Sequence, residues 1–178
     1  DQRDTRVLIR TLAKGQDFLN LYAYTGTFTC AAALGGAKTT VTVDRSETYQ
    51  NWARDNLKLN GLVDPRHTFV QSDTNKFLTQ AYARGHKFTL AFVDPPSFFK
   101  DRSKGVEFDI NRDNQDLIRN VLKIMARGSI VFFSTNHQPF EPQMDTLPIK
   151  NLIELTPKTI PEDYRNRKVH RCWKMSVL

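Results

Sequence analysis

Cysteine is scarce in this sequence, and its apolar residues never form a long run. The two cysteines, Cys30 and Cys172, lie far apart and outside any CxxC or cysteine–histidine cluster, which argues against a disulfide framework or a structural zinc site. No apolar stretch approaches the length of a membrane span, and no signal peptide is recognisable. These absences predict a metal-free cytoplasmic protein rather than a disulfide-bonded secreted domain or a membrane protein.

An initiator methionine is also missing, because the chain begins at Asp1. Its 178 residues are 39% hydrophobic, enough to bury one core, so we expect residues 1–178 to be one domain excised from a longer chain. The net charge of +7 favours a polyanionic partner. Residues 150–178 hold seven basic and three acidic side chains, for which a solvated basic face is an equally good explanation.

Short β-branched runs alternate with helical spacing along most of the chain, the pattern of an α/β fold with a mostly parallel sheet. The expected strands are Phe18–Tyr22, Thr39–Val43, His67–Gln71, Phe88–Val93 and Ser129–Phe133. The expected helices are Thr27–Leu34, Ser46–Asn60, Thr74–Arg84 and Arg112–Met125. Asn60-Gly61 and Arg127-Gly128 resemble helix stop signals.

Five prolines break the chain after Ser134, where only Asn151–Leu155 and Arg171–Val177 have the pattern of strands. Two closing strands joined by a short loop would form an antiparallel hairpin at the sheet edge. The sequence therefore predicts a mixed sheet rather than a purely parallel one.

Polar residues follow the first three expected strands, where ligands bind in a doubly wound sheet. After the first strand, Gly26 could let the backbone approach a ligand, although a Thr-Gly-Thr turn before a helix is often only a tight turn. Asp44 ends the second strand and could accept hydrogen bonds from both hydroxyls of an adenosine ribose. Asp73 follows the third strand and could accept from an adenine amino group, cap the helix that begins near Thr74, or do both.

The loop after the fourth strand is the most specific feature, with the sequence Asp94-Pro95-Pro96-Ser97-Phe98. Proline lacks an N–H and fixes φ, so this loop would hold the Asp94 carboxylate and backbone carbonyls rigidly. These acceptors could address a planar base, and Phe98 could stack on it. The alternative is a proline turn that merely ends the strand.

With these residues, nearly the whole chain resembles the bacterial 23S ribosomal RNA methyltransferases of the cytosine-C5 and guanine-N7 type. It is most similar to the C-terminal half of the bifunctional guanine-N2/guanine-N7 enzyme. The matching segments are Asp1-Gln2-Arg3-Asp4-Thr5-Arg6, Leu19-Asn20-Leu21-Tyr22-Ala23-Tyr24-Thr25-Gly26, Val41-Thr42-Val43-Asp44, Asn56-Leu57-Lys58-Leu59-Asn60-Gly61, Asp94-Pro95-Pro96-Ser97-Phe98, Phe133-Ser134-Thr135-Asn136 and His170-Arg171-Cys172-Trp173.

The resemblance implies a class I, Rossmann-like methyltransferase fold that binds S-adenosyl-L-methionine, and upstream RNA-binding modules, with a second methyltransferase in the bifunctional protein. It implies catalytic roles for Asp94, Pro95 and Phe98. It also places Gln2 and Arg3 near the cofactor, where periodicity alone indicates a frayed terminus. The full cofactor set implied is Gln2, Arg3, Asn20, Tyr24, Thr25, Gly26, Thr27, Phe28, Asp44, Arg45, Ser46, Asp73, Thr74 and Asp94.

Methylation of cytosine C5 needs a thiolate nucleophile, which the similar cytosine enzymes place just after the fifth strand. This chain has Ser134-Thr135-Asn136 there, and Cys30 and Cys172 are expected to be core residues. Guanine N7 carries a lone pair and needs orientation rather than a general base. We therefore expect methylation of guanine N7 in 23S ribosomal RNA, with a weak RNA-contact role for His137 and phosphate contacts from Lys100, Arg102 and Lys104.

Two alternatives remain at this point. The Asp-Pro-Pro loop suits methylation of an exocyclic base amine equally well, and the basic C-terminal stretch also fits a non-catalytic RNA-binding domain with the same fold. A NAD-binding oxidoreductase is a distant third, because the G-x-G-x-x-G spacing is absent.

Overall fold

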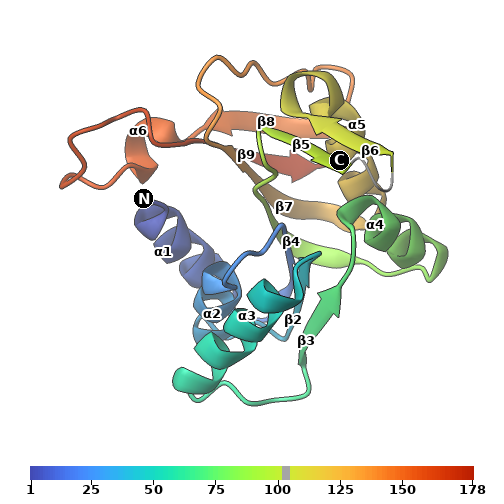
Figure 1. Ribbon diagram of the computed structural model, residues 1–178, viewed down its shortest axis with the longest axis vertical. Coiled ribbons are helices and arrows are strands. Elements are labelled where there is room, and N and C mark those ends of the chain that lie inside the picture. The colour runs from blue at the N-terminus through green and yellow to red at the C-terminus, as the bar shows by residue number, and fades with distance from the viewer. Residues whose placement is uncertain (102–104) are drawn as a thin grey trace.

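A seven-stranded sheet with helices on both faces forms the core of the computed structural model, which describes residues 1–101 and 105–178 (Figure 1). The strand order is β3-β2-β1-β4-β7-β9-β8. The strands of this sheet are β1 Asp17–Leu21, β2 Thr39–Asp44, β3 His67–Gln71, β4 Phe88–Val93, β7 Met125–Thr135, β8 Ile149–Glu154 and β9 Arg171–Val177. The helices are α1 Arg3–Leu12, α2 Thr27–Leu34, α3 Glu47–Leu59, α4 Thr74–Ala83, α5 Ile110–Lys123 and α6 Thr156–Thr159.

Strands β3, β2, β1, β4 and β7 are mutually parallel, so their carboxyl ends meet at one edge of the sheet. β9 lies antiparallel between β7 and β8, which confirms the mixed sheet expected from the sequence. The expected short hairpin loop is wrong, because residues 155–170, which contain α6, connect β8 to β9. This longer connection brings the segment after α6 beside α1.

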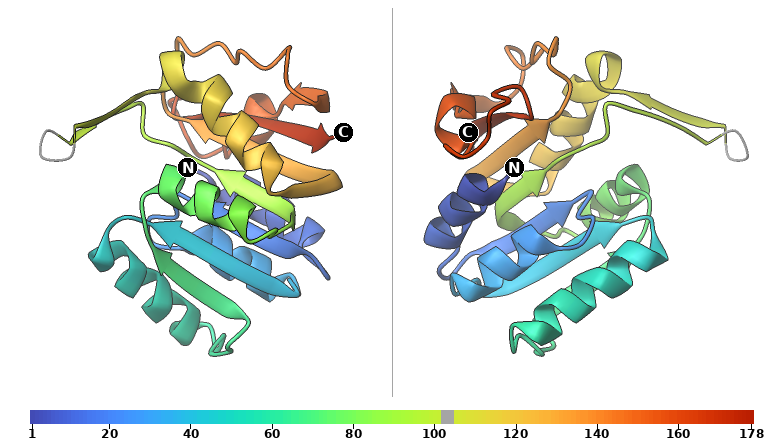
Figure 2. Two further views of the ribbon diagram at one scale, coloured as in Figure 1. Left: turned by 90° about the vertical axis from the view of Figure 1, so that its right-hand side faces the viewer. Right: turned by 60° about the vertical axis from the view of Figure 1, so that its left-hand side comes forward.

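Two apolar layers pack against the sheet, one on each face (Figure 2). One layer joins α1 and α2 to the strands through residues such as Ile9, Phe28 and Phe92. The other joins α4 and α5 to them through residues such as Phe77 and Ile118. The central strands are buried on both faces, which explains their nearly continuous apolar sequences.

Two local features differ from the sequence-based expectations. The N-terminal residues form helix α1 rather than a frayed terminus, because Thr5, Ile9 and Ala13 recur at the helical spacing of four and are buried. Arg127-Gly128 does not end a helix but lies inside β7, near a register irregularity opposite β4. Gly128 has a φ of 80°, which glycine adopts without strain.

A two-stranded antiparallel arm, absent from the strands expected from the sequence, follows the Asp94 loop. It consists of β5 Phe98–Asp101 and β6 Val106–Asp109 and projects from the body of the molecule (Figure 2). Its base is closed by a hydrogen bond from the Ile110 N–H to the Ser97 carbonyl, at 3.0 Å. Within residues 1–101 and 105–178, no helix is both long and apolar enough to cross a membrane.

Candidate functional site

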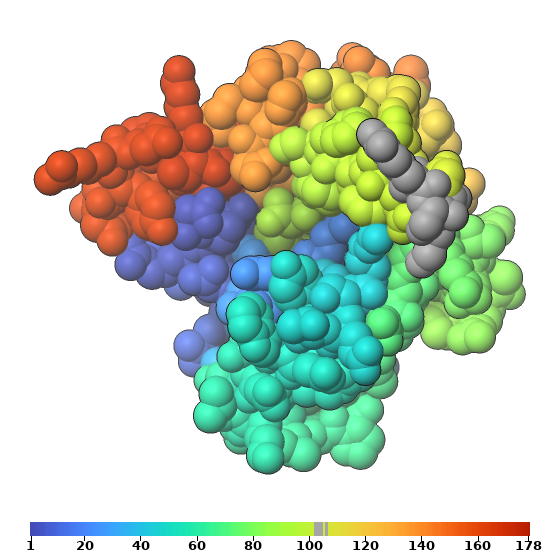
Figure 3. All heavy atoms as spheres, in the orientation of Figure 1, coloured from blue at the N-terminus to red at the C-terminus, as the bar shows by residue number. Residues whose placement is uncertain are grey.

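The carboxyl ends of β1, β2, β3 and β4 bring the expected site residues to one edge of the sheet. Figure 3 shows this edge as a hollow between the α3 region and the yellow-green arm. The loop after β1, Asp44, Asp73 and the Asp94 loop border it, although they lie far apart in the sequence. The fold therefore assembles the four motifs at the place where a doubly wound sheet binds ligands.

The Asp44 carboxylate is the buried anchor of the first two motifs, being only 9% exposed. One of its oxygens accepts the Tyr24 N–H at 2.9 Å, and the other accepts the Ser46 N–H at 2.9 Å. Ser46 also caps α3 by accepting the Tyr49 N–H through its hydroxyl. Because each carboxylate oxygen has a second lone pair, Asp44 can still accept two hydroxyl groups.

The backbone of the loop after β1 is held in an unusual conformation. Tyr24 and Gly26 both have positive φ, at 49° and 70°. A Cβ on Gly26 would lie 2.6 Å from the Cβ of Ala53 on α3, so close packing of this helix requires the glycine. Packing against α3 thus accounts for the glycine, and the expected close approach of a ligand to its backbone stays a prediction.

Several residues of the expected cofactor set have side chains that the structure directs into the core. Phe28 is 7% exposed and stacks on Phe92 with ring centroids 3.6 Å apart. Asn20 is 1% exposed and donates to the Thr29 hydroxyl at 3.0 Å, and that hydroxyl lies 2.8 Å from the Thr42 hydroxyl. The Phe28 and Asn20 side chains therefore pack beneath the loop, and their expected part in cofactor binding stays a prediction.

The remaining loop residues lie at the surface of the cleft. Tyr24 is 53% exposed and Thr27 is exposed, whereas Thr25 is half-buried with its carbonyl accepting the Asn56 side chain at 2.8 Å. Tyr24 also packs edge-on against Tyr49 of α3, with centroids 4.6 Å apart. The loop thus presents Tyr24 and Thr27 to solvent while α3 fixes its backbone.

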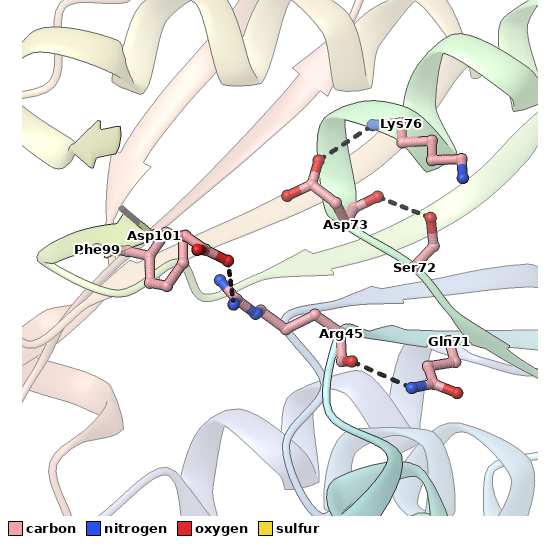
Figure 4. Close-up of a pocket in the computed structure, with 7 residues that line it drawn as sticks. All are labelled: Arg45, Gln71, Ser72, Asp73, Lys76, Phe99 and Asp101. Carbon is pink, nitrogen blue, oxygen red and sulfur yellow. Dashed lines mark hydrogen bonds and ion pairs between the residues drawn. The ribbon is translucent and has the colours of Figure 1, made fainter. Parts of the chain in front are cut away.

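A cavity of about 530 Å³ lies between the start of α4 and the arm (Figure 4). Its lining residues are Arg45, Gln71, Ser72, Asp73, Lys76, Phe99 and Asp101. The Arg45 guanidinium lies 3.9 Å from the centre of the Phe99 ring and 3.3 Å from an Asp101 carboxylate oxygen. Arg45, expected at the cofactor, therefore joins the end of β2 to the arm.

A smaller adjoining cavity of about 90 Å³ reaches the sheet edge itself. Tyr22, Asp44, Thr74 and Pro96 contribute to its walls. The Thr74 hydroxyl hydrogen-bonds the Tyr22 phenol, whose burial raises its pKa above the usual range. Asp73 caps α4 by accepting the Asn75 and Lys76 N–H groups through one oxygen, as one of the two sequence-based readings anticipated.

Asp94 lies at the end of β4 in a half-buried position beside Ser134 of β7. The Gln2 amide donates to the Ser134 hydroxyl at 2.6 Å, and the Gln2 carbonyl accepts from Thr5 at 2.9 Å. A serine hydroxyl has one proton, so Ser134, while accepting from Gln2, can donate that proton to Asp94. Gln2 thus contacts Asp94 only through Ser134, and its amide group bonds to Ser134 and Thr5.

Burial raises the pKa of Asp94 to about 6, while the Ser134 hydrogen bond and nearby His170 act in the opposite direction. His170 is 1% exposed and contacts the Thr159 hydroxyl at 2.9 Å. Burial lowers the pKa of His170, although Asp94 partly offsets this. Burial therefore disfavours the charged form of both groups, while their opposite charges favour it.

Neither cysteine is available as a nucleophile. Cys30 and Cys172 are buried, and burial raises their pKa values to about 11 and about 12. Cys172 lies opposite Ser134 in the β7–β9 register, and the Asp94 charge raises its pKa further. The thiol nearest the candidate site is therefore protonated and enclosed.

The rest of the Asp94 loop is fixed at its base and open at its tip. Pro95 is buried, and the Ser97 hydroxyl donates to the Asn136 side chain at 2.6 Å. Phe98 is 56% exposed at the start of the arm. A rigid loop with an exposed aromatic ring suits stacking on a flat ligand.

The residues expected to contact RNA differ in how the structure places them. Lys100 forms an ion pair with Glu107 at 2.8 Å, so its charge is partly neutralised. Arg102 and Lys104 lie outside the described residues. The His137 ring lies 3.0 Å from the Asn111 side chain, on the same side as the Asp94 loop.

Sequence reasoning gave no site role to Tyr22 or Asp101 and missed the contact of Thr5 with Gln2, whereas Phe99 was expected, as an alternative to Phe98, to stack on the base. Tyr22 could have been found, because it is the last residue of the first expected strand. Phe99 and Asp101 belong to the arm, whose short strands carry no clear alternation. Arg3 is exposed and pairs with Asp163, so it faces the segment after α6.

Residues 1–151 match the family described as S-adenosylmethionine-dependent methyltransferase. The chain is 42% identical over 177 residues to ribosomal RNA large subunit methyltransferase K/L of Syntrophotalea carbinolica, covering 99% of this chain and 24% of that protein. It is 41% identical over 177 residues to ribosomal RNA large subunit methyltransferase K of Neisseria meningitidis serogroup B, covering 98% and 49%. The chain thus spans between a quarter and a half of the length of these relatives.

Solved structures show the same fold at lower sequence identity. A methyltransferase in complex with SAH superposes with a TM-score of 0.84 at 24% identity, covering 99% of this chain and 49% of that one. A SAM-dependent methyltransferase from Agrobacterium tumefaciens has a TM-score of 0.76 at 17% identity, covering 98% and 61%. The likeness extends over nearly all of this chain.

Proposed function

The chain belongs to the S-adenosylmethionine-dependent methyltransferase family, and from this premise we propose that it methylates guanine N7 in 23S ribosomal RNA. Its relatives are named as methyltransferases of large-subunit ribosomal RNA, which supports such an RNA as the substrate. The observation that favours guanine N7 over cytosine C5 is the presence of Ser134 beside Asp94. Methylation of cytosine C5 would need a thiolate at this position. We expect the reaction to take place in the cytoplasm.

The residues at the sheet edge fit the cofactor. Asp44 keeps two free lone pairs for a ribose diol, because its two backbone N–H partners occupy only one position on each oxygen. Tyr22, Pro96 and Phe99 offer apolar walls in the adjoining cavity, as an adenine ring requires. When bound, S-adenosylmethionine supplies an electrophilic methyl group.

Asp94 would bind the guanine edge that carries the N1 and exocyclic N–H groups. An ionised carboxylate accepts both donors, and the Pro95 carbonyl adds a third acceptor. Phe98 would stack on the base after it leaves its RNA helix or loop. Guanine N7 has no proton to lose, so these residues need only orient its lone pair.

Methylation of an exocyclic base amine is the second candidate, and the pKa of Asp94 favours it as a specific observation. A carboxyl with a pKa of about 6 could accept the proton that an amine must release. The two reactions leave different products on the RNA. They are therefore separable by product analysis alone.

The test is incubation of the chain with S-adenosylmethionine and unmodified 23S ribosomal RNA made by transcription. Reduction followed by aniline treatment should cleave the RNA at one new position, and mass spectrometry should show 7-methylguanosine. An N-methylated amine without cleavage would establish the second candidate instead. Cofactor binding by calorimetry without any methylated nucleoside would indicate a non-catalytic RNA-binding domain.

A further inference from the structure

The outer face of α1 carries three arginines in a line, which we call the α1 stripe: Arg3, Arg6 and Arg10. Their spacing of three and four residues places them on one side of the helix, where Arg3 and Arg10 are exposed and Arg6 borders the face buried through Thr5 and Ile9. At 1.5 Å per residue, the stripe extends about 10 Å along the helix. Such a row of like charges is unfavourable in an isolated helix.

Little of this charge is neutralised within the protein. Arg3 pairs with Asp163, but both side chains are more than half exposed, so the pair contributes little. Arg6 is half-buried, and among the residues that the structure describes it has no carboxylate within ion-pair distance. Burial and the Arg3 charge together lower the pKa of Arg6. The side chain is therefore held where a positive charge is costly unless an anion joins it.

The segment after β8 extends the same positive surface. Lys158 of α6, Arg165 and Lys168 are exposed, and the Arg167 guanidinium holds the segment together by donating to the Ile160 and Pro161 carbonyls at 3.2 and 3.3 Å. Figure 3 shows the orange-red atoms of this segment lying directly against the blue atoms of α1. Two sequence-distant basic segments thus form one surface.

This surface begins at the candidate site. Gln2, the residue before Arg3, donates to Ser134, which in turn contacts Asp94. A polymer bound along the α1 stripe would therefore pass from Arg10, in the last turn of α1, to Arg3, beside the Asp94 loop. An extended polyanion fits this geometry better than a single small anion does.

We propose that the α1 stripe, together with Lys158, Arg165 and Lys168, binds consecutive phosphates of the RNA that delivers its base to Asp94. This rests on the proposed function and adds to it the path of the RNA over the protein. Guanidinium groups suit this role, because their planar donors match phosphate oxygens. Such contacts position the RNA without reading its sequence.

The test compares the double variant R6Q/R10Q with the charge-matched control K58Q/R84Q. Lys58 and Arg84 are exposed at the carboxyl ends of α3 and α4, by the edge of the sheet opposite the site. Affinity for 23S ribosomal RNA transcript is measured at several salt concentrations, and affinity for S-adenosylmethionine by calorimetry. We expect R6Q/R10Q to bind RNA about tenfold more weakly and to lower the slope of log affinity against log salt by about 1.5. The control should match the wild type, and cofactor affinity should be unchanged in both.

Equal RNA affinity and salt slope in R6Q/R10Q and the control would overturn the proposal, while leaving methylation itself untouched. A loss of cofactor affinity with unchanged RNA binding would also overturn it, because the stripe would then serve the cofactor. If the wild-type chain neither binds nor methylates the RNA, the proposed function fails together with this surface. The three failures are therefore distinguishable.

Discussion

Replacing Ser134 with alanine should shift the pH at which Asp94 becomes ionised. The Ser134 hydroxyl donates to Asp94, whose pKa is about 6, and Gln2 holds that hydroxyl in place at 2.6 Å. A hydrogen bond to a charged group is worth about 1.5–3 kcal/mol, and one pKa unit corresponds to about 1.4 kcal/mol. Its removal should therefore raise the pKa of Asp94 by about one to two units.

The sign of the effect on activity follows from which form of Asp94 binds guanine. Only the ionised carboxylate accepts two N–H groups, so activity is present above the Asp94 pKa and is lost as the pH falls through it. In Ser134→Ala this loss of activity should occur at a higher pH than in the wild type. Near neutral pH the rate should fall about two- to tenfold, and it should be largely regained at about pH 8.5.

Two other titratable groups face Asp94, namely His170 and Cys172. Burial lowers the pKa of His170 and raises the pKa of Cys172 to about 12, so neither titrates across the shifted limb. The assay is methyl transfer to 23S ribosomal RNA between about pH 5 and 9, with kcat and KM measured separately. Ser134→Thr keeps the hydroxyl and serves as the matched control.

A wild-type midpoint in Ser134→Ala, or a loss of rate that higher pH does not restore, would refute the reasoning. In that case the hydroxyl would serve packing rather than the charge of Asp94. Gln2→Ala provides a second readout, because freeing the Ser134 hydroxyl should move the midpoint in the same direction by a smaller amount. An unchanged midpoint in Gln2→Ala would show that Gln2 does not influence the pKa of Asp94.

Three further predictions concern the cofactor edge, the loop after β1 and the enclosed thiol. Asp44→Asn should weaken S-adenosylmethionine binding about 10- to 100-fold in calorimetry, since an amide cannot accept both backbone N–H groups and a diol. Unchanged affinity would show that Asp44 does not bind the cofactor. Gly26→Ala should lower the free energy of unfolding in urea by about 1–3 kcal/mol more than Gly85→Ala. Both glycines have positive φ, but only a Cβ at position 26 would clash with Ala53. Equal losses of stability in the two variants would contradict this. Cys172→Ala should leave the methylated product unchanged in mass spectrometry, whereas loss of the product at retained stability would indicate a thiol nucleophile.

The order of strands and helices could be predicted well from the sequence, because hydrophobic periodicity is a local signal. The segments His67–Gln71, Phe88–Val93, Arg171–Val177 and Thr27–Leu34 have the expected bounds in the structure. Arg127-Gly128 misled the prediction, because an Arg-Gly pair resembles a helix end and gives no sign that the chain has already entered β7. The connection from β8 to β9 was misjudged because prolines mark breaks but not the path between them.

The positions of Asp44, Asp73 and Asp94 at strand ends were determined by the sequence alone, since βα alternation fixes which residues follow each strand. Whether a side chain points into the cleft or the core depended on packing between distant segments. Phe28 stacks on Phe92, Asn20 bonds to Thr29, and Gln2 bonds to Ser134, which lies 132 residues away in the sequence. No local pattern encodes such contacts, because each exists only after the sheet has brought its partners together.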